Sequence, residues 1–195
     1  MTRSTHTLPP DYFTGLYAAN PDPWDFTTSA YEHAKYDATL AALERETYQQ
    51  ALEVGCSIGV LTHRLAARCT ALLALDVAET ALDAARARCA TQPHVVFQRA
   101  AVPAEWPPGR FDLVVLSEVL YFFTPEDLAR IADRLVAALN PGGEVVLVHW
   151  LGETDFPLSA DAAVEGLIDL TRDRLAPVRQ SRTEGYRLDV LRALA

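Results

Sequence analysis

The chain has 195 residues, a formal net charge of −9 and a hydrophobic fraction of 50%. This length suits one domain with a buried core, and the composition is ordinary for a globular protein. The 17 Lys and Arg residues stand against 26 Asp and Glu residues. We therefore expect no nucleic acid partner, because binding to phosphates needs a basic surface.

The three cysteines, Cys56, Cys69 and Cys89, show no spacing typical of metal ligands. An odd number without a pairing pattern fits the reducing cytoplasm, so we expect a cytoplasmic protein without a metal. The first residues lack the apolar segment of a signal peptide, and no apolar run approaches the roughly 20 residues of a membrane helix. We expect no membrane partner, and a monomer or weak homodimer.

The N-terminal quarter predicts two helices behind a short arm. Residues 1–10 are polar and end in two prolines, which predicts a flexible arm. Asp11 is expected to cap a short helix to Ala19, and Ser29 a longer one to about Glu46. The inner face of the longer helix is expected to carry four side chains, those of Tyr31, Ala34, Leu40 and Leu43.

Strands and helices alternate from Gln49 onward. Strands are predicted at 51–54, 72–76, 95–98, 111–116 and 144–150. Helices are predicted at 60–68, at 79–89, and from the Thr124 cap to a stop at Asn140-Pro141-Gly142-Gly143. Apolar strands that alternate with helices indicate a parallel sheet buried on both faces. A proline-rich link at 102–109 replaces one expected helix.

The pattern changes after Trp150. A helix is predicted over 159–174, followed by two strands at 177–181 and 186–192 that read as a closing hairpin. The predicted fold class is therefore α/β: a mostly parallel seven-stranded sheet with an antiparallel C-terminal hairpin. The single domain expected over 1–195 divides into the helices of 11–46, a core of 49–150 and a C-terminal segment of 151–195.

The most informative stretch runs from Ala51 to Gly59, with the sequence ALEVGCSIG. A strand ends near Glu53, and a turn of small residues lets a ligand approach the backbone closely. The next strand ends at a second acid, Asp76. Ligands of such a sheet bind beyond the carboxyl ends of its strands. Two carboxylates there suit a nucleoside with free ribose hydroxyls.

The spacing of the turn argues against a dinucleotide. A nicotinamide-binding fingerprint needs a third glycine, and here Val60-Leu61-Thr62 follows Gly59. Glu53 would also lie close to a pyrophosphate, where like charges repel. S-adenosylmethionine carries no phosphate and is cationic at its amine and sulfonium, so it fits better.

Four segments together resemble the class I S-adenosylmethionine-dependent methyltransferases. Residues 52–59 resemble their first motif, and Asp76 resembles their acidic ribose-binding residue. Residues 111–121 resemble their fourth motif, and Leu139-Asn140-Pro141-Gly142-Gly143 the turn that follows. From the first segment to the last they span residues 52–143, about half the chain, and they follow the family's order. The resemblance implies the Rossmann-like sandwich of that class.

A narrower resemblance is to the nodulation protein S (NodS) family. It is carried by Pro21-Asp22-Pro23-Trp24-Asp25-Phe26, by residues 29–36 and by residues 117–122. Named members of that family N-methylate the free amine of a deacetylated chitooligosaccharide, while other relatives have different or unknown substrates. The resemblance implies transfer of a methyl group to a small-molecule or oligosaccharide amine. S-adenosyl-L-homocysteine would be the product of the cofactor.

The expected cofactor-binding residues come from the strand ends and from the N-terminal helices, which we expect to form a lid. They are Trp24, Tyr31, Lys35, Glu53, Gly55, Cys56, Ser57, Gly59, Asp76, Val77, Ala101, Val102 and Ser117. Many class I enzymes bind adenine with an Asp after the third strand. Here Ala100-Ala101-Val102 would offer only backbone groups and apolar contact.

Three of these residues have plausible alternatives. Trp24 either covers the sulfonium or pins the N-terminal segment to the core. Lys35 either pairs with the cofactor's carboxylate or lies on a solvated helix face. Cys56 is expected to pack rather than to react, because no His partner is evident.

The expected catalytic residues are Glu118 and His149. Glu118 follows the fourth strand and would receive or orient a proton of the acceptor, or else cap a helix or contact the cofactor. His149 lies at the end of the fifth strand, where it would act as a base or serve a structural role. The expected substrate-binding residues are Tyr12, Tyr121 and Trp150.

Two other functions stay open from the sequence alone. One is a nicotinamide-dependent oxidoreductase on the same sheet, which the missing glycine and Glu53 count against. The other is a protein that binds S-adenosylmethionine without catalysis, which Asp76 and the Ser117-Glu118 segment disfavour.

Overall fold

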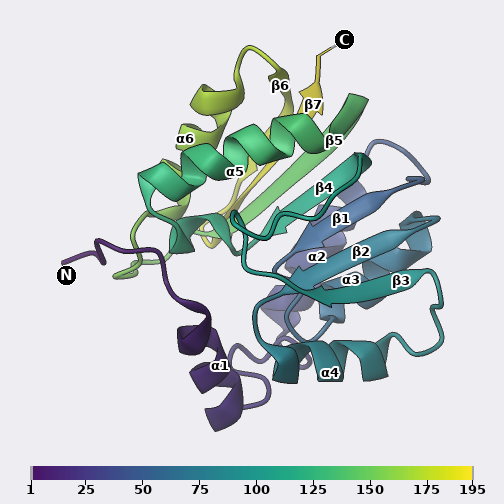
Figure 1. The fold of residues 1–195 in the computed structure, drawn as a ribbon, viewed down its shortest axis with the longest axis vertical. Helices are drawn as coiled ribbons and strands as arrows, with labels where there is room; N and C mark the ends of the chain where they lie inside the picture. The colour runs from purple at the N-terminus through teal and green to yellow at the C-terminus, as the bar shows by residue number, and fades with distance from the viewer. Residues whose placement is uncertain (1, 195) are drawn as a thin grey trace. The chain divides into compact units, whose positions relative to one another are not determined.

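The computed structural model describes residues 2–194 (Figure 1). Met1, part of the predicted arm, and Ala195, the end of the predicted C-terminal segment, lie outside the described residues. Where the sequence predicts one domain, the structure divides the chain into two compact units. The N-terminal unit comprises residues 9–101. The C-terminal unit comprises residues 102–194 together with residues 2–8. Each is described by itself.

Three parallel strands form the sheet of the N-terminal unit. They are β1 (Ala51–Val54), β2 (Leu72–Asp76) and β3 (Val95–Arg99), in the spatial order β3-β2-β1. Every residue of β1 is buried, as expected for a parallel strand covered on both faces. Val54 pairs with Leu75, so β1 and β2 end at the same edge. This register brings the two acidic strand ends to one place.

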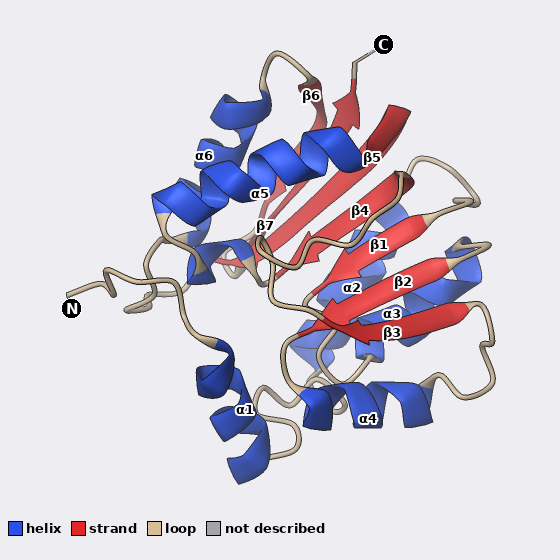
Figure 2. Ribbon diagram, viewed as in Figure 1, coloured by secondary structure: helices blue, strands red, loops and turns tan. Residues whose placement is uncertain are grey.

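The helices of the N-terminal unit are α1 (Pro10–Ala19), α2 (Ala30–Ala42), α3 (Val60–Leu65) and α4 (Glu79–Arg88) (Figure 2). The Ser29 hydroxyl caps α2 by accepting the N–H of Glu32, as the sequence predicts. This helix ends at Ala42, four residues before the predicted end. The predicted helix over 60–68 instead tightens into a 3₁₀ turn, η1 (Ala66–Arg68).

The predicted inner face of α2 is confirmed at Leu43, which is buried, and in part at Leu40, which is half-buried, but it is wrong at the other two positions. Tyr31 and Ala34 are exposed, and the buried residues of the helix are Glu32, Lys35, Tyr36, Thr39 and Ala42. The apolar pattern misled because two charged residues lie inside as a pair, with Lys35 Nζ 2.9 Å from Glu32 Oε2. A buried charge is tolerated when an opposite charge balances it. The attraction between the two charges offsets the cost of taking the Lys35 ammonium group out of water.

Four strands form the sheet of the C-terminal unit. They are β4 (Phe111–Ser117), β5 (Leu139–Trp150), β6 (Leu175–Arg182) and β7 (Tyr186–Ala193), in the order β4-β5-β7-β6. β4 and β5 are parallel, whereas β7 is antiparallel to both of its neighbours. The predicted closing hairpin is therefore present, with β6 at the sheet edge.

Two longer helices, α5 (Pro125–Ala138) and α6 (Ala160–Thr171), pack against each other in the C-terminal unit. Thr124 and Ser159 cap them through their hydroxyls. The Asn140–Gly143 segment does not separate helix from strand as predicted. α5 ends two residues earlier, and β5 already begins at Leu139, opposite Phe111. The pairing then shifts, so these turn residues form an irregularity inside β5.

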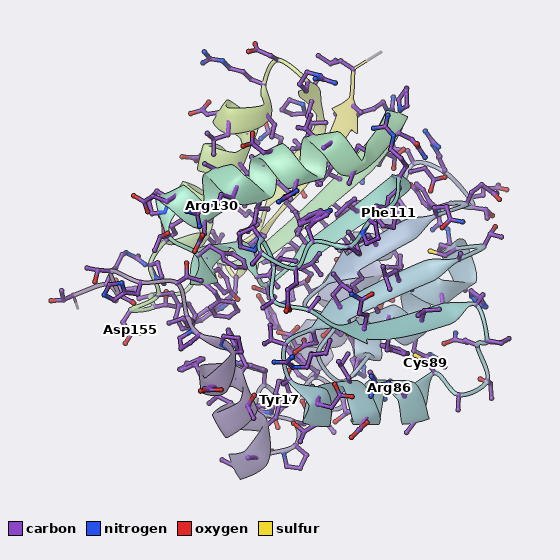
Figure 3. The ribbon with its side chains drawn as sticks, in the orientation of Figure 1. Tyr17, Arg86, Cys89, Phe111, Arg130 and Asp155 are labelled. Atoms are coloured by element: carbon purple, nitrogen blue, oxygen red, sulfur yellow. The ribbon has the colours of Figure 1, made fainter. Side chains whose placement is uncertain are left out.

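The start of the chain differs from the predicted flexible arm. The Ser4 N–H donates to the Asp155 carbonyl, and the Leu8 N–H donates to the Phe122 carbonyl. The Thr7 hydroxyl donates to Asp127 Oδ2 at 2.6 Å and accepts the N–H of Thr124. Asp155 is labelled beside this segment in Figure 3. Residues 4–8 are thus hydrogen-bonded to the C-terminal unit.

The predicted fold class is confirmed: the chain has the seven strands of a mostly parallel α/β sheet that ends in an antiparallel hairpin. A separate observation concerns membranes. Within residues 2–194, no helix combines the length and the apolar character that spanning a bilayer requires.

Candidate active site

The turn after β1 has an unusual backbone. Gly55 and Gly59 adopt φ values of 78° and 77°, and Ser57 between them adopts 52°. Glycine takes this left-handed conformation readily, whereas for Ser it costs roughly 1–2 kcal/mol. Strain of this kind persists where surrounding contacts impose it, and it is common at functional sites. The turn therefore fits a ligand-binding loop.

Asp76, at the end of β2, is fully oriented by backbone groups. Its Oδ2 accepts the N–H of Ser57 at 2.8 Å, and its Oδ1 accepts the N–H of Ala78 at 3.0 Å. Burial raises the pKa of Asp76, and these N–H groups oppose that rise because they favour the charged form. Each carboxylate oxygen keeps acceptor capacity for a further donor. The arrangement suits two adjacent hydroxyl groups of a ribose.

Glu53 lies inside β1 with 2% of its surface exposed. Burial raises its pKa to about 7, the nearby Thr62 hydroxyl lowers it, and the charge of Asp76 raises it. Its Oε2 is buried and has no hydrogen-bond partner among residues 2–194. A buried acceptor without a partner is costly, and an ammonium group placed there would satisfy it. Glu53 and Asp76 thus fit the amine and the ribose of S-adenosylmethionine.

Packing against neighbouring residues accounts for two of the predicted cofactor residues, Gly59 and Cys56. A Cβ added to Gly59 would lie 2.8 Å from the Cβ of Ala85, so the absence of a side chain lets α4 pack closely. The Cys56 side chain packs with Ala74 and Leu82, and burial raises the pKa of its thiol. The structure therefore favours a packing role for Cys56, as expected, and explains Gly59 without a ligand.

Trp24 stands in a run of aromatic rings. It stacks on Phe26 with ring centroids 5.4 Å apart, and it meets the Tyr17 ring edge-on at 5.8 Å. Such pairs contribute about 0.5–1.5 kcal/mol each beyond the area they bury. Trp24 nevertheless keeps 38% of its surface exposed. It therefore pins the segment before α2 to α1 and still presents a face to a ligand.

Tyr31 and Lys35 lie next to each other on α2. Lys35 Nζ is 5.1 Å from the centre of the Tyr31 ring and donates to Glu32 Oε1 at 3.0 Å. Lys35 is 1% exposed, so the alternative of a solvated helix face is wrong. Tyr31 keeps 41% exposure. A contact of either residue with the cofactor stays a prediction.

The other predicted contact residues belong to both units and differ in exposure. Val77 and Ala101 are half-buried, and the intervening Ala100 donates its N–H to the Asp76 carbonyl at 3.0 Å. Tyr12 on α1 is 41% exposed. Val102 and Ser117 are half-buried members of the C-terminal unit.

Glu118 is the second strained residue of the candidate site. It follows β4 with φ 57°. Its Oε2 accepts the Tyr121 hydroxyl at 2.7 Å and the backbone N–H of Trp150 at 2.9 Å. These two donors come from the turn after β4 and from the last residue of β5, and they fix the carboxylate in one orientation. A strained, half-buried and oriented acid fits a catalytic role better than a helix cap.

His149 is completely buried, and its Nε2 accepts the backbone N–H of Leu120 at 3.1 Å. The Nε2 lone pair is therefore engaged, and the ring carries its proton on Nδ1. Its ring also meets the Tyr121 ring edge-on at 5.4 Å. This geometry favours the structural alternative, in which His149 positions the 3₁₀ turn η2 (Leu120–Phe122). A role as the base stays a prediction.

Tyr121, whose hydroxyl donates to Glu118, belongs to a cluster of aromatic rings. Tyr121 stacks on Phe156 with centroids 5.3 Å apart, and Phe156 meets Phe122 at 4.8 Å. Trp150 is 42% exposed, and its ring lies against Gly152, where an added Cβ would come within 1.9 Å of the indole. Gly152 thus permits the observed position of Trp150. Of the predicted substrate residues, the structure brings Tyr121 and Trp150 together around Glu118.

The sequence analysis missed three residues of this arrangement: Tyr17, Gly152 and Phe156. Tyr17 lies on α1, and its hydroxyl shares a hydrogen bond with the Ser57 hydroxyl. Gly152 and Phe156 lie in a segment without a motif. A glycine two residues after an exposed Trp is the one signal available there, and it is too weak to predict a contact.

Comparison with known proteins assigns the family. The family model described as Nodulation protein S (NodS) matches residues 16–186. The chain belongs to the NodS family. A nodulation protein S from Sinorhizobium fredii is 35% identical over 132 residues, which cover 66% of this chain and 60% of that protein. The chain thus spans less than two thirds of that relative. The predicted family is confirmed.

Solved structures share the fold. A putative methyltransferase from Pseudomonas syringae is 36% identical with a TM-score of 0.74, and the match covers 84% of this chain and 99% of that one. The N-methyltransferase NodS from Bradyrhizobium japonicum WM9, in complex with S-adenosyl-L-homocysteine, has a TM-score of 0.80 at 23% identity, with 94% and 98% covered.

Proposed function

We propose that this chain is an S-adenosylmethionine-dependent methyltransferase whose acceptor is an amine of a small molecule or an oligosaccharide. Membership of the NodS family supports the reaction class. The observation that carries the proposal is the pair of buried acids at the ends of β1 and β2, on either side of a turn with left-handed backbone. These groups suit a cationic nucleoside and disfavour a pyrophosphate.

On the donor side, the chain binds and orients. Asp76, held by the N–H groups of Ser57 and Ala78, accepts the ribose hydroxyls. The unpartnered Oε2 of Glu53 accepts the ammonium group. When bound, S-adenosylmethionine supplies a methyl group already activated by its sulfonium. The chain therefore contributes mainly proximity and alignment to the reaction.

On the acceptor side, the chain attracts an ammonium group and removes a proton. An amine attacks only when it is neutral, and the Glu118 carboxylate both draws the protonated amine and takes a proton from it. Tyr121 and the Trp150 N–H hold Oε2 of Glu118 during this step. The nitrogen gains the methyl group, and the proton it loses passes to Glu118 and then to water.

The aromatic rings support an amino sugar as the acceptor. An exposed Trp attracts a nearby cation through the face of its ring and offers a flat apolar surface. Trp150 is such an exposed Trp, and its backbone N–H donates to Glu118. The net charge of −9 also favours a cationic substrate. The relative from Bradyrhizobium japonicum, named an N-methyltransferase, supports nitrogen as the acceptor atom.

A methyl-transfer screen tests this proposal. The protein is incubated with methyl-labelled S-adenosylmethionine and with glucosamine or deacetylated chitooligosaccharides, alongside simple amines and hydroxylated aromatics. We expect label on the nitrogen of an amine-bearing sugar. Label only on hydroxylated aromatics would show that the acceptor atom is oxygen and would contradict the proposed amine acceptor. The absence of transfer to every acceptor would contradict the whole proposal.

A further inference from the structure

Tyr17, on α1, is not part of the function proposed above. It is 7% exposed, and its hydroxyl shares a hydrogen bond with the hydroxyl of Ser57. Figure 3 labels Tyr17. Burial, and then the charge of Asp76, raise its pKa well above the ordinary tyrosine value. The phenol is therefore neutral at pH 7, and it shares this hydrogen bond with Ser57 as an uncharged hydroxyl.

Ser57 needs contacts that hold it. Its left-handed φ of 52° costs energy that a glycine would not pay. Two hydrogen bonds hold it: its N–H donates to Asp76 Oδ2 at 2.8 Å, and its hydroxyl bonds to Tyr17. The first fixes the backbone and the second fixes the side chain. Ser57 is thus clamped between α1 and the end of β2.

The Tyr17 ring is itself held in place. The Trp24 ring meets it edge-on, with an interplanar angle of 76°, and Trp24 stacks on Phe26. A ring packed in this way has little rotamer freedom, so its hydroxyl occupies a defined point. The hydrogen bonds then run from Tyr17 through Ser57 to Asp76, the residue proposed to bind the ribose.

We propose that Tyr17 is a positioning residue for the methyl donor: through Ser57 it holds the turn and the Asp76 carboxylate in the orientation that accepts the ribose hydroxyls. Tyr17 acts without touching the reacting atoms. This inference rests on the proposed function for the identity of the ligand that Asp76 binds. It adds a residue of α1 to the determinants of donor affinity.

The Tyr17→Phe variant tests the role, because it removes the hydroxyl and keeps the ring. Titration calorimetry with S-adenosyl-L-homocysteine should give a Kd about 3- to 10-fold higher than that of the wild type, the value of one neutral hydrogen bond. KM for the donor should rise by the same factor, and kcat at saturating donor should stay within about twofold.

Tyr48→Phe is the matched control. Tyr48 is a fully buried tyrosine of the same unit, and its hydroxyl accepts the Arg45 N–H at 3.3 Å in the segment before β1. Its removal should leave Kd and donor KM unchanged. A Tyr17→Phe protein with wild-type Kd and donor KM would overturn the proposal, as would an equal loss of affinity in both variants.

A second variant separates positioning from stability. Ser57→Gly relieves the strained φ and removes the hydroxyl, so its melting temperature should equal or exceed that of the wild type while its Kd rises. Adding Tyr17→Phe to it should weaken binding no further, because Tyr17 then has nothing to hold. If the losses of donor affinity in the two single variants added up in the double variant, Tyr17 would not act through Ser57. Failure of the wild type to bind S-adenosyl-L-homocysteine would instead remove the proposed function as well.

Discussion

Each of the two units carries its own group of candidate functional residues, the donor half and the acceptor half of the proposed chemistry, and the two groups are built differently. The donor half, formed by Glu53, residues 55–59 and Asp76 in the N-terminal unit, is oriented by backbone N–H groups at strand ends. The acceptor half, formed by Glu118, Tyr121 and Trp150 in the C-terminal unit, depends mainly on side chains. Backbone geometry follows from local sequence, whereas side-chain packing brings together residues far apart in the chain. In the acceptor half the sequence therefore predicted Glu118, Tyr121 and Trp150 as single residues, but not the contacts that join them.

Both halves nevertheless contain a non-glycine residue with a left-handed backbone conformation. Ser57 and Glu118 are non-glycine residues with φ near +55°, and each is held by hydrogen bonds from another segment. Strain that surrounding contacts must maintain is a cost without benefit to stability, so it points to function at both positions. The comparison predicts that substitutions in one half change donor affinity and those in the other change turnover.

The largest effect is expected at Glu118. Glu118→Gln keeps the shape of the side chain and removes the charge that accepts the proton. We expect kcat to fall by about 10²–10⁴-fold, the range for loss of a general base, while the Kd for S-adenosyl-L-homocysteine stays unchanged. Single-turnover methyl transfer and calorimetry on the same protein measure the two quantities.

Glu126→Gln is the control for Glu118→Gln, because Glu126 is an exposed acid in the first turn of α5. It should retain wild-type turnover. If Glu118→Gln also turned over normally, Glu118 would be excluded from catalysis and the acceptor half would lose its base.

Asp76→Ala should weaken binding of the donor, whereas Glu118→Gln should lower turnover. The substitution removes both carboxylate oxygens that orient toward the ribose, so we expect donor affinity to fall by about 1–3 kcal/mol, the cost of losing hydrogen bonds to a charged group. Calorimetry with S-adenosyl-L-homocysteine gives the value. Unchanged affinity would remove Asp76 from the site and break the distinction between the halves.

A pH dependence is expected from Glu53, whose pKa is raised to about 7. An acid with a raised pKa in the folded state binds extra protons there, so its contribution to stability is present below about pH 4.5 and lost as pH rises through 7. The carboxylate that then forms is the form that binds an ammonium group. Donor affinity should therefore increase about tenfold from pH 6 to pH 8.

Glu53→Gln provides the test of that assignment, since it cannot ionise. Kd measured by calorimetry over the same pH range should be flat in this variant apart from a constant offset. If the pH dependence of Kd in this variant equalled that of the wild type, another group would be responsible for it, and Glu53 would not be the residue that binds the ammonium group.

The smallest effect is expected from Gly152→Ala. The new Cβ would overlap the Trp150 indole, whose nearest atom lies at 1.9 Å, so the ring must move while the backbone stays. We expect KM for the acceptor to rise about 2- to 10-fold, the value of one aromatic contact, with donor Kd unchanged. Steady-state kinetics with a fixed, saturating donor measure it.

Gly15→Ala is the matched glycine control, because an added Cβ there meets nothing within 4 Å. It should leave acceptor KM unchanged. A Gly152→Ala enzyme with normal acceptor KM would mean that the position of Trp150 does not matter to the substrate.

The sequence predicted the parts that local rules determine. β1 and β2 were predicted with their observed bounds, and Asp76 was placed at a strand end because apolar strands end at polar residues. The hydroxyl caps of α2 and α5 were also predicted, because Ser and Thr before a helix accept its first N–H groups. Such features depend on residues a few positions apart. The cap predicted at Asp11 is wrong: α1 begins at Pro10, after Pro9, and has no side-chain cap.

The sequence failed where distant partners decide the outcome. Residues 4–8 are fixed by partners more than 100 positions away. Lys35 is a different case: Glu32, the acid that balances its charge, is a near neighbour on α2, but an apolar pattern does not reveal a charged pair that is turned inward. His149 reads as a free base until the Leu120 N–H is found on its Nε2. Asn140–Gly143 reads as a stop, yet Leu139 already pairs with Phe111. None of these contacts leaves a periodic trace in the sequence.

The central claim is that the donor half binds a cationic nucleoside rather than a dinucleotide. Calorimetry of the wild-type protein with S-adenosyl-L-homocysteine and, separately, with NAD tests it most directly. The account predicts saturable 1:1 binding of S-adenosyl-L-homocysteine and no heat from NAD. Binding of NAD together with no binding of S-adenosyl-L-homocysteine would contradict it.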